Sequence, residues 1–208
     1  MVTKNATKNT VEELLAERGT TYAEQAGIKL ADKPAPLYQL LVLTTLLSVR
    51  IKAELAVDAA RELFRAGWRT PKAMRESTWQ QRVDALGRAH YVRYDESTAR
   101  YLGEAAERVI ETYHGDLRHL AEKADGDVGR LRQLLTEFPR IGATGAQIFC
   151  REAQAVWPWL RPYFDKRALV GAKKVGLPAD PDRLAKLVSP DDQARLAAAL
   201  TRVSLARR

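Results

Sequence analysis

The sequence predicts an all-α protein built of two helical lobes with a cleft. Apolar residues recur at helical spacing through almost the whole chain, and the strict alternation typical of strands is hard to find. Proline, glycine, serine, threonine and aspartate interrupt this pattern at short intervals, which predicts roughly ten short helices. Both ends of the chain supply helices around a central segment. We therefore expect one lobe of about residues 36–135 and a second that combines 11–35 with 136–208.

The composition fits a soluble protein with a basic surface. Of 208 residues, 46% are apolar and 29% are charged, and the chain is long enough to bury a real core. Lys and Arg total 34 against 26 Asp and Glu, and the resulting net charge of +8 attracts polyanions such as nucleic acid. Nothing at the N-terminus resembles a signal peptide, and the apolar run 37–47 is too short for a bilayer, which takes about 20 residues. We expect a cytoplasmic monomer, nucleoid-associated if bacterial, with no membrane partner.

The first third of the chain predicts a terminal tail and a buried helix. Residues 1–10 are polar and are expected to be disordered, and residues 11–18 form a helix that ends at Gly19. Two prolines at 34 and 36 stop the preceding segment, and residues 37–47 are apolar on nearly all sides, as in a central helix. Ser48 is expected to cap the next helix, 52–65.

Residues typical of N-caps predict where the later short helices begin. Thr70 and Thr78 precede two short ones, and Asp180 and Ser189 open the final two. The helices expected between these pairs are 95–113, 116–124, 127–136, 143–156 and 165–175.

Residues 135–149 contain the most informative motif. A helix ends in a tight turn with Pro139 and Gly142 and opens directly into a second helix. The amides of such a helix N-terminus point outward, and their partial positive charge favours an anion such as a DNA phosphate. Asp165 follows nineteen residues after Ala146, next to two cations, and a carboxylate near a phosphate-binding turn is typical of enzymes that act on DNA bases.

This combination resembles the helix–hairpin–helix DNA glycosylases of the endonuclease III superfamily. The resemblance covers residues 36–178. The hairpin reads Leu-Pro-Gly-Val-Gly in the family, whereas here Arg140 stands where the first glycine is usual. The alternative interpretation of this hairpin is a connector between two helices that binds no ligand. Cys150 is the only cysteine, so the four-cysteine iron–sulfur cluster of the family is excluded. The expected DNA-binding residues are Arg140, Ile141, Gly142, Ala143, Thr144, Gly145, Lys166 and Arg167.

The resemblance makes Asp165 the catalytic acid. Such a carboxylate stabilises positive charge on the sugar as the glycosidic bond breaks and activates a water nucleophile. A structural role as the N-cap of helix 165–175 is the alternative, and both roles are compatible. Thr144 occupies the position of the family lysine, and because a hydroxyl forms no Schiff base, the resemblance implies a monofunctional hydrolase with weak or no lyase activity.

Two segments match the family loops that fill the gap left by a flipped base. The first contains Arg50, for which a surface arginine is the alternative. The second contributes His90, Tyr91 and Arg93, for which aromatic packing on the core is the alternative.

The sequence thus predicts a base-excision DNA repair glycosylase whose partner is double-stranded DNA with a damaged or modified base. A non-catalytic helix–hairpin–helix DNA-binding protein is the main alternative, and a helical interaction protein the third. We expect no cofactor, no iron–sulfur cluster and no side-chain metal site. Related hairpins hold a monovalent cation through backbone carbonyls, and the corresponding place in this chain is near Phe138 and Ile141.

Overall fold

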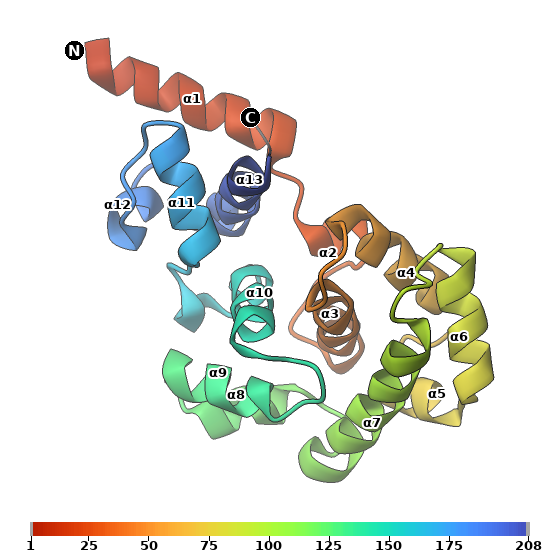
Figure 1. Cartoon of the computed structure of the whole chain (residues 1–208). Coiled ribbons are helices and arrows are strands. Elements are labelled where there is room, and N and C mark those ends of the chain that lie inside the picture. The colour runs from red at the N-terminus through yellow and green to blue at the C-terminus, as the bar shows by residue number, and fades with distance from the viewer. Residues whose placement is uncertain (1, 207–208) are drawn as a thin grey trace. The chain divides into compact units, whose positions relative to one another are not determined.

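A computed structural model describes residues 2–206, with side chains from residue 5 onward, and within that range every regular element is a helix (Figure 1). The chain forms two compact units: unit 1 combines the residues up to Tyr22 with those from Cys150 onward, and unit 2 is Ala23–Phe149. The boundaries differ from the predicted lobes, because residues 23–35 and the hairpin belong to unit 2. The prediction of an all-α fold is confirmed.

The α-helices of unit 2 are α2 (Tyr22–Gln25) from its second residue on, α3 (Pro34–Leu47), α4 (Ala53–Arg65), α5 (Pro71–Glu76), α6 (Trp79–Arg88), α7 (Asp95–Tyr113), α8 (Arg118–Ala124), α9 (Val128–Thr136) and the start of α10 (Ala143–Ala153). Those of unit 1 are α1 (Val2–Arg18), the end of α10, α11 (Lys166–Lys174), α12 (Pro181–Ala185) and α13 (Gln193–Leu205), with 3₁₀ turns η1 (Pro158–Leu160) and η2 (Pro190–Asp192).

Unit 2 is organised around α3, the predicted central helix. Every residue from Leu37 to Leu46 is buried, and α4 and α7 pack directly against this helix. Prolines 34 and 36 do not stop the chain as expected; Pro34 begins α3, where a missing N–H costs nothing. Burial raises the pKa of the Tyr38 phenol far above its ordinary value.

A buried arginine ties α5, α6 and α7 together. The Arg82 guanidinium donates to the carbonyls of Ser77 and Ala99, each at 2.7 Å, and to that of Met74 at 3.2 Å. The same region confirms the two predicted caps: Thr70 accepts from Ala73, and Thr78 forms a reciprocal capping box with the third residue of α6. These contacts fix the frame that carries the loop before α7.

Unit 1 packs α11 against α13, with α1 also lying against α13 (Figure 1). A Cβ on Gly171 would lie 1.8 Å from the backbone oxygen of Leu200, so only glycine permits this approach. Val11 and Leu14 of α1 enter the same apolar core. The expected disordered tail is wrong for residues 2–10, which the structure places in α1; residue 1 lies outside the described range.

Candidate nucleic-acid interface and acidic site

The hairpin between α9 and α10 is a tight turn. The Ile141 N–H donates to the Phe138 carbonyl at 3.2 Å, Pro139 is the second residue of the turn, and Arg140 has a φ of 69°. Proline followed by a positive φ is the pattern of a type II turn, whose third position normally requires glycine. Arg140 therefore adopts a strained backbone conformation that the family glycine would adopt freely.

Two buried side chains anchor this turn to unit 2. Phe138 and Ile141 are 2% and 3% exposed, and the Phe138 ring stacks on Tyr113 at 5.9 Å between centroids. Arg108 lies over Phe138 at 5.7 Å and forms an ion pair with Glu137. Of the other hairpin residues predicted to contact DNA, Arg140, Gly142, Ala143 and Thr144 are exposed, whereas Gly145 is buried. The first turn of α10 is thus held rigidly while its amides, which lack intrahelical acceptors, are presented outward.

Gly145 brings the start of α10 against the end of α3. A Cβ at this position would lie 2.4 Å from the Ser48 hydroxyl, which itself donates to the Thr44 carbonyl at 2.7 Å. Ser48 therefore closes α3, and the expectation that it caps α4 is wrong; Lys52 occupies that position. The exposed Arg50 lies in the short segment that follows. Two of the predicted DNA-contacting segments are consequently neighbours within unit 2.

The loop before α7 only partly matches its prediction. Tyr91 is 1% exposed, its hydroxyl lies 3.3 Å from Thr98 Oγ1, and burial raises the pKa of its phenol. It is a core residue, so it is wrong as a wedge. His90, with a φ of 59°, and Arg93 are exposed as expected. Between them Val92 is 64% exposed, an apolar side chain at the loop tip that sequence reasoning missed.

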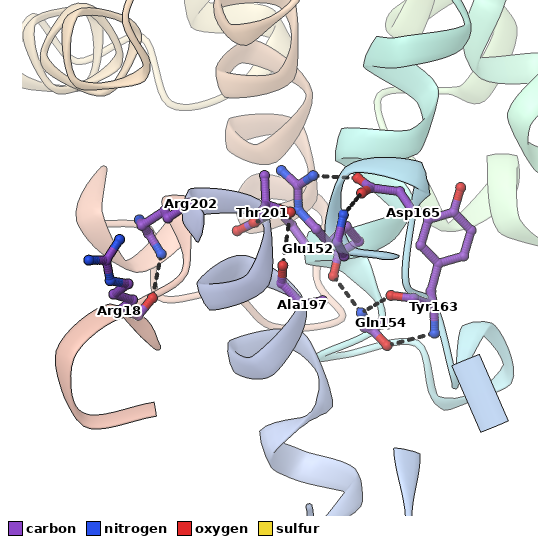
Figure 2. Close-up of polar contacts among 10 residues, drawn as sticks. Arg18, Glu152, Gln154, Tyr163, Asp165, Ala197, Thr201 and Arg202 are labelled. Atoms are coloured by element: carbon purple, nitrogen blue, oxygen red, sulfur yellow. Dashed lines mark hydrogen bonds and ion pairs between the residues drawn. The ribbon is translucent and has the colours of Figure 1, made fainter. Parts of the chain in front are cut away.

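Asp165 lies in unit 1 at the N-terminus of α11, where the sequence predicts an N-cap. One carboxylate oxygen accepts from the Ala168 N–H at 2.9 Å, and the other forms an ion pair with Arg151 (Figure 2). The residue is 6% exposed. Lys166 and Arg167, which follow it, are exposed in the first turn of α11.

Arg151 is the partner that the sequence did not reveal. Its side chain is 2% exposed, its guanidinium carbon lies 5.7 Å from the Tyr22 ring centre, and its Nε lies 3.8 Å from a carboxylate oxygen of Glu152. Burial lowers the pKa of Arg151, but the charges of Asp165 and Glu152 outweigh burial, so the pKa is raised above its ordinary value. The available signal was a pair of adjacent charged residues, Arg151 and Glu152, within a helix whose other buried residues are small or apolar.

Hydrogen bonds between side chains and the backbone hold the segment that leads into Asp165. The Gln154 amide donates to the Tyr163 carbonyl at 2.8 Å and accepts from the Tyr163 N–H at 3.0 Å (Figure 2). Arg161 donates to the carbonyls of Gln154 and Ala155 at 2.7 and 2.9 Å. The chain that leads into Asp165 is thereby held by the side chains of Gln154 and Arg161.

The chemistry available is anion binding by the hairpin in unit 2 and a fixed carboxylate in unit 1. Thr144 is exposed, and its side chain carries a hydroxyl and no amine. Over the described residues, no three His, Cys, Asp or Glu side chains gather as a metal-binding group, and no helix is long and apolar enough to cross a bilayer. The monovalent cation at the hairpin carbonyls stays a prediction.

The overall fold is that of a helix–hairpin–helix DNA glycosylase. The structure is similar to that of endonuclease III trapped as a covalent intermediate with DNA in an estranged-adenine complex, with a TM-score of 0.51 and 16% identity over 93% of this chain and 84% of the other. The sequence matches no protein-family model and no curated protein. The likeness establishes the fold.

Proposed function

We propose that this chain is a base-excision DNA repair protein that binds duplex DNA through its hairpin and removes a base as a monofunctional glycosylase. The observation that supports the proposal most strongly is the hairpin on this fold, which is anchored by the buried Phe138 and Ile141 and is exposed at Arg140 and over residues 142–144. A turn held this way keeps backbone N–H groups aimed at one point, so little entropy is lost when a phosphate binds there.

Catalysis is assigned to Asp165. Its carboxylate is fixed by the N–H of Ala168, and the exposed cations Lys166 and Arg167 of the same helical turn provide phosphate contacts beside it. A carboxylate held in place stabilises the positive charge that develops on the sugar without reorganisation during the reaction. Water then adds to the sugar carbon as the bond to the base breaks, which leaves an abasic site and a free base.

Strand cleavage is not expected to follow. A lyase step requires an amine that adds to the sugar carbon, and Thr144 offers only a hydroxyl. The abasic product is therefore stable until alkali cleaves it.

The Arg151–Asp165 ion pair favours a second candidate, a DNA-binding protein without catalysis. Both carboxylate oxygens of Asp165 have partners, and the guanidinium offsets the negative charge that would stabilise a cationic sugar. In this second function the pair is purely structural, and only the hairpin acts on DNA.

Labelled duplexes that each carry one lesion test both candidates. The set contains an oxidised pyrimidine, an oxidised guanine, an alkylated base, uracil, a mismatch and an abasic site, each assayed with and without alkali. A glycosylase yields alkali-dependent cleavage of at least one duplex, and Asp165→Asn abolishes it. Binding of duplex without release of any base from this set supports the non-catalytic candidate. Cleavage without alkali contradicts the assignment of Thr144.

Matched variants separate catalysis from folding. Arg151→Met breaks the same ion pair but keeps the Asp165 carboxylate, so its folded fraction should retain base release. Asp180→Asn makes the same chemical change at another N-cap, in α12 of the same unit, and should leave the activity unchanged. Equal loss in Asp165→Asn and Arg151→Met, measured per folded molecule, would contradict a direct role of the carboxylate.

A further inference from the structure

Three arginines and two tyrosines alternate beside the hairpin of unit 2. The guanidinium carbon of Arg140 lies 5.8 Å from the ring centres of both Tyr94 and Tyr101. Arg93 lies 5.3 Å from the Tyr94 ring, and Arg100 lies 4.9 Å from the Tyr101 ring. All three arginines are exposed, whereas both tyrosines are partly buried. We call these five residues the arginine–tyrosine ladder.

The ladder joins the hairpin to the helix that follows the second predicted wedge loop. Tyr94 is the N-cap residue of α7, and Tyr101 lies seven residues later on the same face of that helix. Arg140 belongs to the hairpin turn and fills the position between the two rings. Segments that are about forty residues apart in the sequence thus present one continuous surface.

Backbone strain marks Arg140 as more than a surface residue. Its φ of 69° is unfavourable for any residue with a Cβ, by roughly 1 kcal/mol or more. An exposed arginine gains little from burial, so the two aromatic contacts are what hold its guanidinium in place. A strained residue of this kind is typical of a functional surface.

Asp95 and Glu104, two acidic residues of the helix that carries the tyrosines, form no ion pair with Arg93 or Arg140. Asp95 accepts from the Glu96 N–H at 2.8 Å, and Glu104 lies 3.7 Å from Arg100 in an exposed pair that contributes little. Within residues 5–206, Arg93 and Arg140 form no ion pair. Their charges are therefore available to an external anion.

We infer that the arginine–tyrosine ladder binds the phosphodiester backbone of duplex DNA and extends the contact made by the hairpin. The inference rests on the proposed DNA binding and adds a second contact surface to it. Two guanidinium groups already lie over each tyrosine ring, where a stacked base would otherwise lie. The ladder therefore presents positive charge to DNA, and its aromatic faces are not available for base stacking. Guanidinium groups held in place bind phosphate with little loss of side-chain entropy. The ladder is thus a sequence-independent surface, in contrast to a base-stacking wedge.

Fluorescence anisotropy with an undamaged labelled duplex over a series of salt concentrations tests this inference. Arg140→Gly should weaken binding about tenfold and lower the slope of log affinity against log salt by about 0.9, the value for one phosphate contact. The same variant should raise the melting temperature, because glycine relieves the positive φ. The double variant Tyr94→Leu/Tyr101→Leu keeps every arginine and should also weaken duplex binding. Arg61→Gln, which removes an exposed arginine of α4, is the matched control and should bind like the original protein.

The outcomes separate the ladder from the proposed function. Salt-dependent binding by the original protein, with unchanged affinity and slope in both ladder variants, overturns the ladder and leaves DNA binding intact. A tyrosine double variant that loses single-stranded DNA but not duplex overturns the assignment to the backbone in favour of base stacking. No salt-dependent binding by the original protein overturns the proposed function and the ladder with it.

Discussion

Replacement of Asp165 by asparagine should destabilise unit 1 substantially. The side chains of Arg151 and Asp165 are 2% and 3% exposed, so the substitution leaves a buried guanidinium without its main partner. Breaking a buried pair of this kind costs about 3–5 kcal/mol of unfolding free energy. Glu152, whose carboxylate lies 3.8 Å from Arg151, still offsets part of the buried positive charge in the variant. The expected loss of unfolding free energy is therefore near the lower end of this range, at about 3 kcal/mol.

Related substitutions divide this loss between the ion pair and the cap. Asparagine still accepts the N–H of Ala168, whereas Asp165→Ala removes the cap as well and should cost about 1 kcal/mol more. Arg151→Met leaves two buried carboxylates without a cation and should be at least as destabilising as Asp165→Asn. The double variant Arg151→Met/Asp165→Asn should cost less than the sum of the single changes, with a coupling of about 2 kcal/mol.

Tryptophan fluorescence during urea unfolding measures these changes within unit 1. Trp157 and Trp159 stack at 5.7 Å in that unit, so replacing Trp68 and Trp79 of unit 2 by phenylalanine leaves a reporter for unit 1 alone. Asp180→Asn, an exposed cap, serves as the control and should shift stability by no more than about 0.5 kcal/mol. A loss below about 1 kcal/mol for Asp165→Asn would show that the Arg151–Asp165 pair contributes no more than a surface ion pair, which has that magnitude.

Three further predictions follow from close packing and from charge. Gly171→Ala should lower the free energy of unfolding by several kcal/mol, on the order of 3 or more, because the added methyl meets the Leu200 carbonyl. Thermal unfolding followed by circular dichroism would show the loss, and an unchanged melting temperature would contradict this packing. Gly145→Ala should lower the free energy of unfolding by about 1–3 kcal/mol and weaken duplex binding, because the added methyl displaces the turn that carries Arg50. Thermal melting measures the first effect and fluorescence anisotropy the second. Normal affinity for the duplex would contradict a role in DNA binding for the contact between Gly145 and Ser48. The Arg118 hydrogen bond holds the pKa of Asp116 below its ordinary value, so this carboxylate stabilises the fold above its unfolded pKa and the contribution is lost as the pH falls through the lower folded pKa. Asp116→Asn should therefore destabilise at about pH 7 and have little effect at about pH 2 in urea unfolding, and an equal effect at both would disprove the assignment.

Local sequence determined the helices and most of their ends. The apolar run 37–47 had to be buried on all sides, and it lies in the core of unit 2. Thr70, Thr78 and Asp180 accept hydrogen bonds from the first turns of their helices, as their positions before those helices predicted. These outcomes depend on interactions within a few residues, which a sequence specifies directly. The hairpin and the N-cap position of Asp165 belong to the same category.

Only the tertiary structure decided which side chains are available for function. Tyr91 and Val92 are neighbours in one loop, yet the first is buried against Thr98 and the second is exposed. Arg151 pairs with Asp165 across fourteen residues. The ladder likewise brings Arg140 together with Tyr101, although α8 and α9 lie between them in the sequence. Such contacts depend on how distant segments pack, and the spacing of residues along a single chain carries no direct record of that packing.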